Sequence, residues 1–375
     1  MLYLPVLLAV SALAGPGPEP TRVGPVEPSG PAPLVAAREL KIATLVPEKS
    51  IWGKALRDLD MECRDATDGR VKLKIYPGGV AGDEPDILRK MRIGQLHGAL
   101  LSVAGLGEIE RSAQLFQIPL FLRSEAEAQH VLREMDSDFR ARFEAEGYVL
   151  IHWVHSGWLN FFSTQPVRTV GDLKGLKQFV WAGDGSLTRW YEEAGFRPIP
   201  LAATDVITGF KTGMIECVPG PPQWVLSLQW YRSAGHMLDY PVSPLYGGLV
   251  LSQRAWKRLS DADRKALLAA GEKAQAFLMR EVPRKEQEAV AAMRERGLVV
   301  TEPLPSRGAP SWVALADHFA ERMSKAWVAP EVRSEVDRHL AEFRSKNSSN
   351  GSKSLAPAGS GGERSSTRPA ENPGR

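Results

Sequence analysis

The sequence predicts an α/β protein with largely parallel sheets, and two observations lead to that class. Patterns typical of strands alternate with patterns typical of helices from residue 38 to residue 344. Such alternation favours parallel sheets, because each parallel connection needs a crossover that is usually a helix. The 375 residues, of which 43% are hydrophobic and 24% charged, also suffice for one large domain or two medium ones with a sizeable core.

The first half of the chain shows these patterns in order. Residues 71–76 alternate apolar and polar side chains, as a half-buried strand does. Residues 52–67 have helical apolar spacing and follow Ser50, a suitable N-cap. Residues 83–94 open with acidic side chains and close with a glycine, which predicts a second helix. Further strands are predicted at 40–45, 99–103, 149–154 and 160–164.

The second half continues the alternation and contains the longest helical pattern. Residues 260–296 begin with Ser260 and have two aspartates in the first turn, which is a good helix start. We expect Pro283 to kink or divide this helix, because a proline inside a helix removes a hydrogen bond and clashes with the preceding turn. The remaining predicted elements are helices at 187–194, 204–212, 311–325 and 330–344, and strands at 198–201, 214–218 and 298–300.

The N-terminus is typical of a targeting segment. Residues 2–14 form an apolar run that is too short to span a bilayer, and the run ends in Ala12-Leu13-Ala14, a small-x-small pattern that suits signal peptidase. No basic residue precedes the run, so a poorly defined apolar tail is the alternative. We predict a signal peptide at residues 1–14 and a periplasmic protein that is soluble after cleavage.

Two segments have compositions typical of disorder. Residues 15–37 are rich in proline and glycine, and residues 345–375 are rich in serine, glycine, lysine and proline. Neither segment can bury enough apolar surface to fold. We predict a disordered linker at 15–37 and a disordered tail at 345–375.

Charge and cysteine content exclude several classes of protein. The formal net charge of +3 and the scattered basic residues give no support for nucleic acid or a membrane surface as partner. Cys63 and Cys217 form no CxxC pair, so neither a zinc site nor a dithiol motif is indicated. We expect two buried free thiols rather than the long-range disulfide that an oxidising compartment would allow.

The sequence shows no catalytic constellation. His152 and His155 fall on a strand pattern, where residues three apart face opposite sides, so they do not predict a metal site. Ser156-Gly157 lacks the rest of a nucleophile elbow, and 105–107 lacks the rest of a dinucleotide fingerprint. We therefore predict a protein that is not an enzyme and has no cofactor and no metal.

Five segments carry motifs in a specific order. They are 67–79 (TDGRVKLKIYPGG), 82–84 (GDE) with 91–96 (MRIGQL), 118–121 (IPLF), 166–177 (PVRTVGDLKGLK) and 212–216 (TGMIE). Each is weak alone, but in this order, over about residues 40–340, the chain resembles the DctP-like solute receptors of TRAP transporters, the tripartite ATP-independent periplasmic transporters. The glycines of these motifs suit tight turns and a helix stop before a strand.

The resemblance implies a fold and a role. The implied fold is two α/β lobes that close on a ligand at a hinge, a clamshell like that of periplasmic binding proteins, with a long helix near the C-terminal half. On this chain, lobe I would be 38–158 plus 246–284, and lobe II would be 159–245 plus 285–344. The implied partners are a small-molecule ligand and the membrane permease subunits of a TRAP transporter. Closure would let the permease distinguish loaded from empty receptor.

The chain departs from this family where the family binds carboxylates. Leu159 and Phe179 stand where the resemblance implies substrate-binding arginines. Asp205 and Ile207 stand where it implies glutamate and tyrosine, and 217–222 reads CVPGPP in place of polar groups. The anion-binding chemistry is therefore predicted to be absent.

Aromatic side chains are predicted to take its place. The chain has 10 tryptophans, and several fall on segments expected to line the cleft. We expect an aromatic-lined interlobe cleft for an apolar or weakly polar ligand, because small-molecule pockets are mostly apolar with few polar anchors. For each aromatic residue taken alone, a place in the core is an equal expectation. The predicted ligand-binding residues are Trp52, Trp158, Leu159, Phe162, Phe179, Trp181, Trp224 and Tyr246.

Two other roles fit the same sequence. The lobes could serve as a periplasmic carrier or sensor that passes a hydrophobic ligand to a non-TRAP partner; a neighbouring permease gene would favour the transporter instead. An exported enzyme on a receptor-like scaffold is the second alternative. It would need a compact cluster of titratable groups in the cleft, where the sequence offers only Asp205, Glu216 and scattered histidines.

Overall fold

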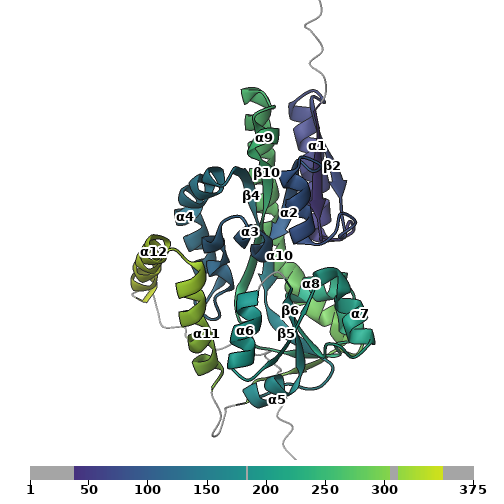
Figure 1. The fold of residues 1–375 in the computed structure, drawn as a ribbon, viewed down its shortest axis with the longest axis vertical. Helices are drawn as coiled ribbons and strands as arrows, with labels where there is room; N and C mark the ends of the chain where they lie inside the picture. Colours follow the sequence, from purple (N-terminus) through teal and green to yellow (C-terminus); the bar gives the residue numbers. More distant parts are fainter. Residues whose placement is uncertain (1–37, 183–184, 305–310, 349–375) are drawn as a thin grey trace, which may run out of the picture. The chain divides into compact units, whose positions relative to one another are not determined.

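Two β-sheets and the helices around them make up the part of the chain that the structure describes (Figure 1). This computed structural model describes residues 38–182, 185–304 and 311–348. The predicted α/β class is confirmed. The predicted signal peptide, the linker and most of the predicted tail lie outside the described residues.

The first sheet has five strands in the order β2-β1-β3-β10-β4. β1 pairs in parallel with β2 and with β3, whereas β10 lies antiparallel between β3 and β4. Its strands are β1 (Arg38–Thr44), β2 (Val71–Tyr76), β3 (Gly98–Ser102), β4 (Tyr148–Trp158) and β10 (Pro244–Ser252). The helices of this part are α1 (Ile51–Ala66), α2 (Glu84–Arg92), α3 (Val103–Gly107), the 3-10 helix η1 (Arg111–Gln117), α4 (Glu125–Ala145) and α9 (Gln253–Trp256).

The second sheet has six strands in the order β11-β9-β5-β8-β6-β7. Its pairs are parallel except that β5 runs antiparallel to β8 and β9. Its strands are β5 (Asn160–Ser163), β6 (Lys177–Trp181), β7 (Arg197–Leu201), β8 (Cys217–Gly220), β9 (His236–Leu238) and β11 (Val299–Thr301). The helices between them are α5 (Val170–Gly175), α6 (Gly185–Glu193), η2 (Ala203–Asp205), α7 (Val206–Lys211), α8 (Pro222–Ser227) and η3 (Trp230–Arg232).

The long helix α10 (Asp261–Arg294) packs against elements of both parts. It contacts α1 and β4 beside the first sheet and α8 beside the second. The predicted start is confirmed, because the Ser260 hydroxyl accepts the N–H of Asp263. The expected division at Pro283 is wrong, since the helix is continuous through it. Buried side chains on both sides of the exposed proline, Val282 and Ala289 among them, hold the helix by packing.

Two further helices follow β11, namely α11 (Trp312–Trp327) and α12 (Pro330–Ser348). α11 contacts η1, and α12 packs on α4, both beside the first sheet. The Arg344 guanidinium binds the Glu127 carboxylate across the α12–α4 contact, with N–O distances of 2.8 Å. The lobe boundaries remain a prediction, but this contact brings a segment expected in lobe II onto a helix of lobe I.

Both cysteines lie in apolar surroundings. Cys63 and Cys217 are free thiols, both buried, and they belong to different hydrophobic clusters. Burial raises the pKa of the Cys63 thiol to about 11, and burial also raises the pKa of Cys217. Neither thiol is therefore activated as a nucleophile at neutral pH.

Candidate ligand-binding cleft

The chain crosses between the two sheets beside Leu159. β4 ends at Trp158 and β5 begins at Asn160, so a single residue joins the two sheets at this point. The Leu159 N–H donates to the Ser243 carbonyl at 2.9 Å, and the Val242 N–H donates to the Leu159 carbonyl at 2.9 Å. The two crossing segments are thus paired with each other.

A cavity of about 120 Å³ lies beside this crossing point. Side chains from both parts of the chain line it, with Ser102 and Gln117 on the side of the first sheet. Four predicted ligand-binding residues line this cavity: Leu159, Phe179, Trp181 and Trp224. The sequence did not single out Tyr191 or Trp230, which line it too, and Pro219 of β8 and Pro221 just after it complete this part of the wall.

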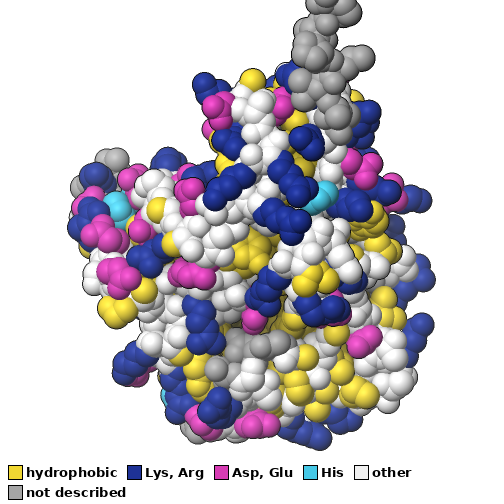
Figure 2. All heavy atoms as spheres, turned by 45° about the horizontal axis from the view of Figure 1, so that its top comes forward, with side chains coloured by type: hydrophobic (Ala, Val, Ile, Leu, Met, Phe, Trp, Pro, Cys, Tyr) yellow, Lys and Arg dark blue, Asp and Glu magenta, His cyan; other side chains and the backbone are white. Residues whose placement is uncertain are grey.

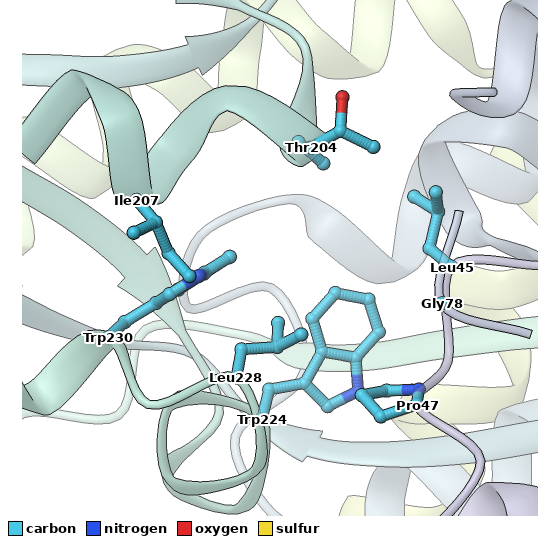
Figure 3. A pocket seen from close by; sticks show the side chains of 9 residues that line it. Leu45, Pro47, Gly78, Thr204, Ile207, Trp224, Leu228 and Trp230 are labelled. Atoms are coloured by element: carbon cyan, nitrogen blue, oxygen red, sulfur yellow. The ribbon is translucent and has the colours of Figure 1, made fainter. Parts of the chain in front are cut away.

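A second cavity, of about 220 Å³, adjoins the first (Figure 3). Leu45 and Pro47, from the loop after β1, face Ile207 and Trp230 across the space. Trp224 and Trp230 line both cavities, so these two indoles mark the division between them. We call the pair of cavities the cleft, the first being its inner cavity and the second its outer cavity.

Neither cavity has a charged side chain among its described lining residues. Leu159 and Phe179 occupy the wall of the inner cavity, so a side chain at either position would reach a ligand there. Arg168 and Arg189, the two arginines that follow Leu159 and Phe179 in the sequence, are exposed. On the face shown in Figure 2, hydrophobic side chains gather in the lower half while basic and acidic ones are interspersed around them.

The other predicted residues lie behind the cleft and line neither cavity. Trp52, Phe162 and Tyr246 are 1%, 0% and 0% exposed, and they belong to the core. The Trp158 indole N–H donates to Glu125 at 3.0 Å. Trp52 nevertheless supports the cleft, because its ring stands edge-on to that of Trp224 with centroids 6.1 Å apart. The Trp52 N–H donates to the His155 carbonyl at 2.9 Å, which fixes this support.

The two sides of the cleft touch each other at its edge. The Asp83 carboxylate accepts the N–H of Glu84, as the N-cap of α2, and also the N–H of Ala203 at 3.0 Å. A Cβ on Gly79 would lie 3.0 Å from the Thr204 methyl carbon, so the loop before α2 packs closely on η2. The start of α2 and η2 are thus in direct contact at this edge.

A buried carboxylate joins the segments behind the cleft. Glu286 of α10 accepts the N–H of Trp158 at 3.2 Å and the N–H of Gln223 at 3.0 Å, which come from β4 and α8. Burial raises the pKa of Glu286 to about 8. Gly157 has φ of +100°, and a Cβ there would lie 2.5 Å from the Glu286 carboxyl carbon. Glycine at this position lets the strand pass the carboxylate.

Titratable groups do gather nearby, but not in the cleft. Glu125 lies 3.1 Å from the His155 Nε2 and accepts the Tyr246 hydroxyl at 3.4 Å. None of these three residues, nor Glu286, lines either cavity. In the described part of the chain, no group of three or more His, Cys, Asp or Glu residues could hold a metal ion. The cluster therefore supports the cleft wall rather than reaching a ligand.

The family model for bacterial extracellular solute-binding proteins, family 7 (DctP), matches residues 42–324 of this chain. The chain belongs to the DctP family. A solute-binding protein of Chromohalobacter salexigens is 29% identical over 236 residues, which are 59% of this chain and 66% of the relative, just under two thirds of its length. The sialic acid-binding periplasmic protein SiaP of Vibrio cholerae is 22% identical over 282 residues, covering 73% and 86% of the two chains.

Solved structures of DctP-family proteins share this fold. A TRAP periplasmic solute-binding protein of Xanthobacter autotrophicus, with bound β-D-galacturonate, superposes with a TM-score of 0.74 at 20% identity, covering 80% of this chain and 99% of that one. The two-lobed clamshell is thereby confirmed as the fold. In the described part of this DctP-family chain, no helix is long and apolar enough to cross a membrane.

Proposed function

We propose that the protein is the extracytoplasmic receptor of a TRAP-type secondary transporter and that it captures an apolar or weakly polar small molecule in the aromatic-lined cleft. Its partners would be the membrane permease subunits, and its place would be the periplasm after signal cleavage. No catalytic role is proposed. Family membership supports the receptor role, and the lining of the inner cavity supports the ligand class.

One observation carries the ligand class: Leu159 and Phe179 both line the inner cavity, and no charged side chain joins them among the described residues. A carboxylate that enters a closed cleft loses its water. This loss costs several kcal/mol unless a charge-assisted partner such as an arginine fork offsets it. Burial of apolar ligand surface, in contrast, contributes about 25 cal/mol per Å².

The relatives give the contrasting case. The structures from Xanthobacter autotrophicus and from Roseobacter denitrificans hold β-D-galacturonate and L-galactonate, which are sugar acids. We infer that this chain keeps the family's fold but binds an apolar or weakly polar ligand instead of a sugar acid. Sugar acids and small dicarboxylates should therefore bind poorly.

Native mass spectrometry of the mature protein, with extraction of any co-purified molecule, tests the ligand class together with calorimetry against a panel of organic acids and hydrophobic compounds. Micromolar or tighter binding of an unmodified sugar acid or dicarboxylate would overturn the apolar class. A carrier or sensor with a non-TRAP partner is the second candidate. Co-purification of a cross-linked TRAP permease subunit from membranes would exclude that candidate.

A further inference from the structure

The tryptophans that line the cleft differ in their hydrogen bonding from Trp52 and Trp158, which lie behind it. Trp52 and Trp158, behind the cleft, each donate their indole N–H to an oxygen of the protein. Trp181, Trp224 and Trp230 line the cleft, and their indole N–H groups have no hydrogen-bond partner within the described residues. An indole N–H can only donate, so a ligand that displaces water from it without offering an acceptor leaves the donor unpaired at a cost in free energy.

Trp230 makes the case most clearly. Its side chain is only 6% exposed, yet it lines both cavities. The Trp230 indole nitrogen is not one of the fully buried atoms that lack a partner, so water can reach this N–H from the cleft, and a ligand that displaces the water must supply an acceptor of its own. The Tyr191 hydroxyl and the Gln117 amide also line the inner cavity and have no partner in the described chain. The cleft therefore offers several neutral hydrogen-bond donors and no cation.

The shape of the cleft adds a second constraint. The inner cavity of about 120 Å³ is close to the ~150 Å³ of a cavity that holds benzene, and its walls include Phe179 and Trp181. The outer cavity of about 220 Å³ is lined by aliphatic groups such as Leu45 and Ile207 (Figure 3). A compact molecule would fill one cavity, whereas an elongated one would fill both.

We propose that the ligand is an uncharged, elongated molecule that carries an acceptor oxygen, as a ketone, ester or ether does, between a ring-sized group and an aliphatic arm. The ring-sized group lies beside Phe179, the arm lies between Leu45 and Ile207, and the oxygen accepts from Trp230 or Trp224 at the division between the cavities. A plain hydrocarbon leaves these donors unpaired, and a carboxylate finds no cation. This inference rests on the proposed function and names its ligand class.

Calorimetric titration of the mature protein with three matched series of probes tests the inference. The probes are phenyl alkyl ketones from acetophenone to hexanophenone, alkylbenzenes of the same lengths, and phenylalkanoic acids. We expect ketones to bind about three- to tenfold more tightly than the matched alkylbenzenes. We also expect affinity to rise about three- to fourfold for each added CH₂ while the arm fills the outer cavity.

Replacement of single indoles by phenyl rings locates the acceptor. Trp230→Phe keeps a ring in the wall and removes the N–H, so ketone affinity should fall about three- to tenfold while alkylbenzene affinity stays within about twofold. Trp256→Phe is the matched control, because Trp256 of α9 lines neither cavity. Thermal unfolding of each variant checks that the fold is retained.

The outcomes separate this inference from the proposed function. Equal binding of ketones and alkylbenzenes would overturn the acceptor and leave the apolar cleft intact. Affinity that does not depend on the length of the alkyl chain would overturn the inference that the ligand fills both cavities. The failure of every ketone to bind would overturn the inference as well. Preferential micromolar binding of the phenylalkanoic acids would instead overturn the proposed function itself.

Discussion

The Oδ2 atom of Asp83 accepts a hydrogen bond from the backbone N–H of Ala203 at 3.0 Å, and this bond joins the start of α2 to η2 across the edge of the cleft. The other oxygen of the same carboxylate caps α2 through the Glu84 N–H. Burial raises the pKa of this carboxyl group. One side chain thus starts a helix beside the first sheet and binds the backbone of η2 across the edge of the cleft.

The two roles of Asp83 can be separated by substitution. Asp83→Ser keeps a good N-cap but is too short to reach Ala203, so stability should change by less than about 0.5 kcal/mol while ligand affinity falls about tenfold. Asp83→Ala should lower both the stability and the ligand affinity. Calorimetry and small-angle scattering with bound ligand measure the effect. Unchanged affinity in Asp83→Ser would show that the bond does not contribute to closure.

Glu84 should make stability depend on pH. Its side chain is 2% exposed and accepts both the N–H and the hydroxyl of Ser102, and burial raises its pKa to about 7 from 4.5. The folded state therefore holds a proton that the unfolded state releases between these values. The stability that this proton contributes is fully present below about pH 4.5 and is lost as pH rises through about 7.

Glu84→Gln keeps one acceptor oxygen for the Ser102 N–H, places an amide donor beside the Ser102 hydroxyl and does not titrate. We expect the free energy of unfolding of the unmodified protein to fall relative to the variant, by on the order of 2 kcal/mol, between pH 4.5 and pH 8. Urea unfolding of both proteins across this range measures the difference. Parallel pH profiles would show that Glu84 titrates normally.

Gly157 should tolerate no side chain. Its φ of +100° disfavours other residues, and a Cβ would meet the Glu286 carboxylate. Gly157→Ala should cost about 2–3 kcal/mol of stability. Gly147→Ala is the control, because Gly147 has φ of +83° but no atom lies within 4 Å of the added Cβ. This variant measures the cost of the backbone conformation alone, which should be about 1 kcal/mol. Equal losses in denaturant unfolding would argue against the contact with Glu286.

Phe179→Arg alone should not restore sugar-acid binding. The side chain is 9% exposed, so a guanidinium there loses water and finds no carboxylate among the described lining residues. We expect lower stability, by about 2–3 kcal/mol, and no micromolar binding of D-glucuronate by calorimetry. Arg168→Ala, at an exposed site, should change neither property. Tight glucuronate binding by Phe179→Arg would show that the rest of an anion site is present.

Export should end in cleavage after Ala14. The apolar run closes with Ala12-Leu13-Ala14, and N-terminal sequencing of the periplasmic protein should begin at Gly15. Ala12→Asp alters the small residue that signal peptidase requires, so this variant should accumulate uncleaved. Intact Met1 on protein from the cytoplasm would contradict the prediction.

Elements with a clear periodic spacing of apolar residues or a clear N-cap were predictable from the sequence. Elements that depend on packing against distant parts of the chain were not. Strand 71–76 and the start of α10 at Ser260 were predicted correctly. β10 was missed because Gly247 and Gly248 weaken a strand pattern. The structure shows why they are there: a Cβ on Gly247 would lie 2.3 Å from the Leu101 carbonyl of the neighbouring strand. α4 was missed although Ser124 and Glu127 form an N-terminal signature.

The site could be predicted only in part. Phe179 was predicted in the wall because it stands where the resemblance implies a substrate-binding arginine, and Trp181 because it falls on the same segment; both line the inner cavity. Tyr246 and Phe162 are equally aromatic but face the core, and composition does not separate these two fates. Trp230 was missed because its place depends on the turn between α8 and β9, which no local pattern specifies.

The position of β10 between β3 and β4 bears on the order in which the chain can fold. β3 and β4 are consecutive in this sheet's sequence, yet the strand that joins them begins only at Pro244, after most of the second sheet has been synthesised. A nascent chain that ends before this residue has two unsatisfied strand edges and no continuous first sheet. The first sheet can therefore be completed only after Pro244–Ser252 has been synthesised, whatever order the other strands follow.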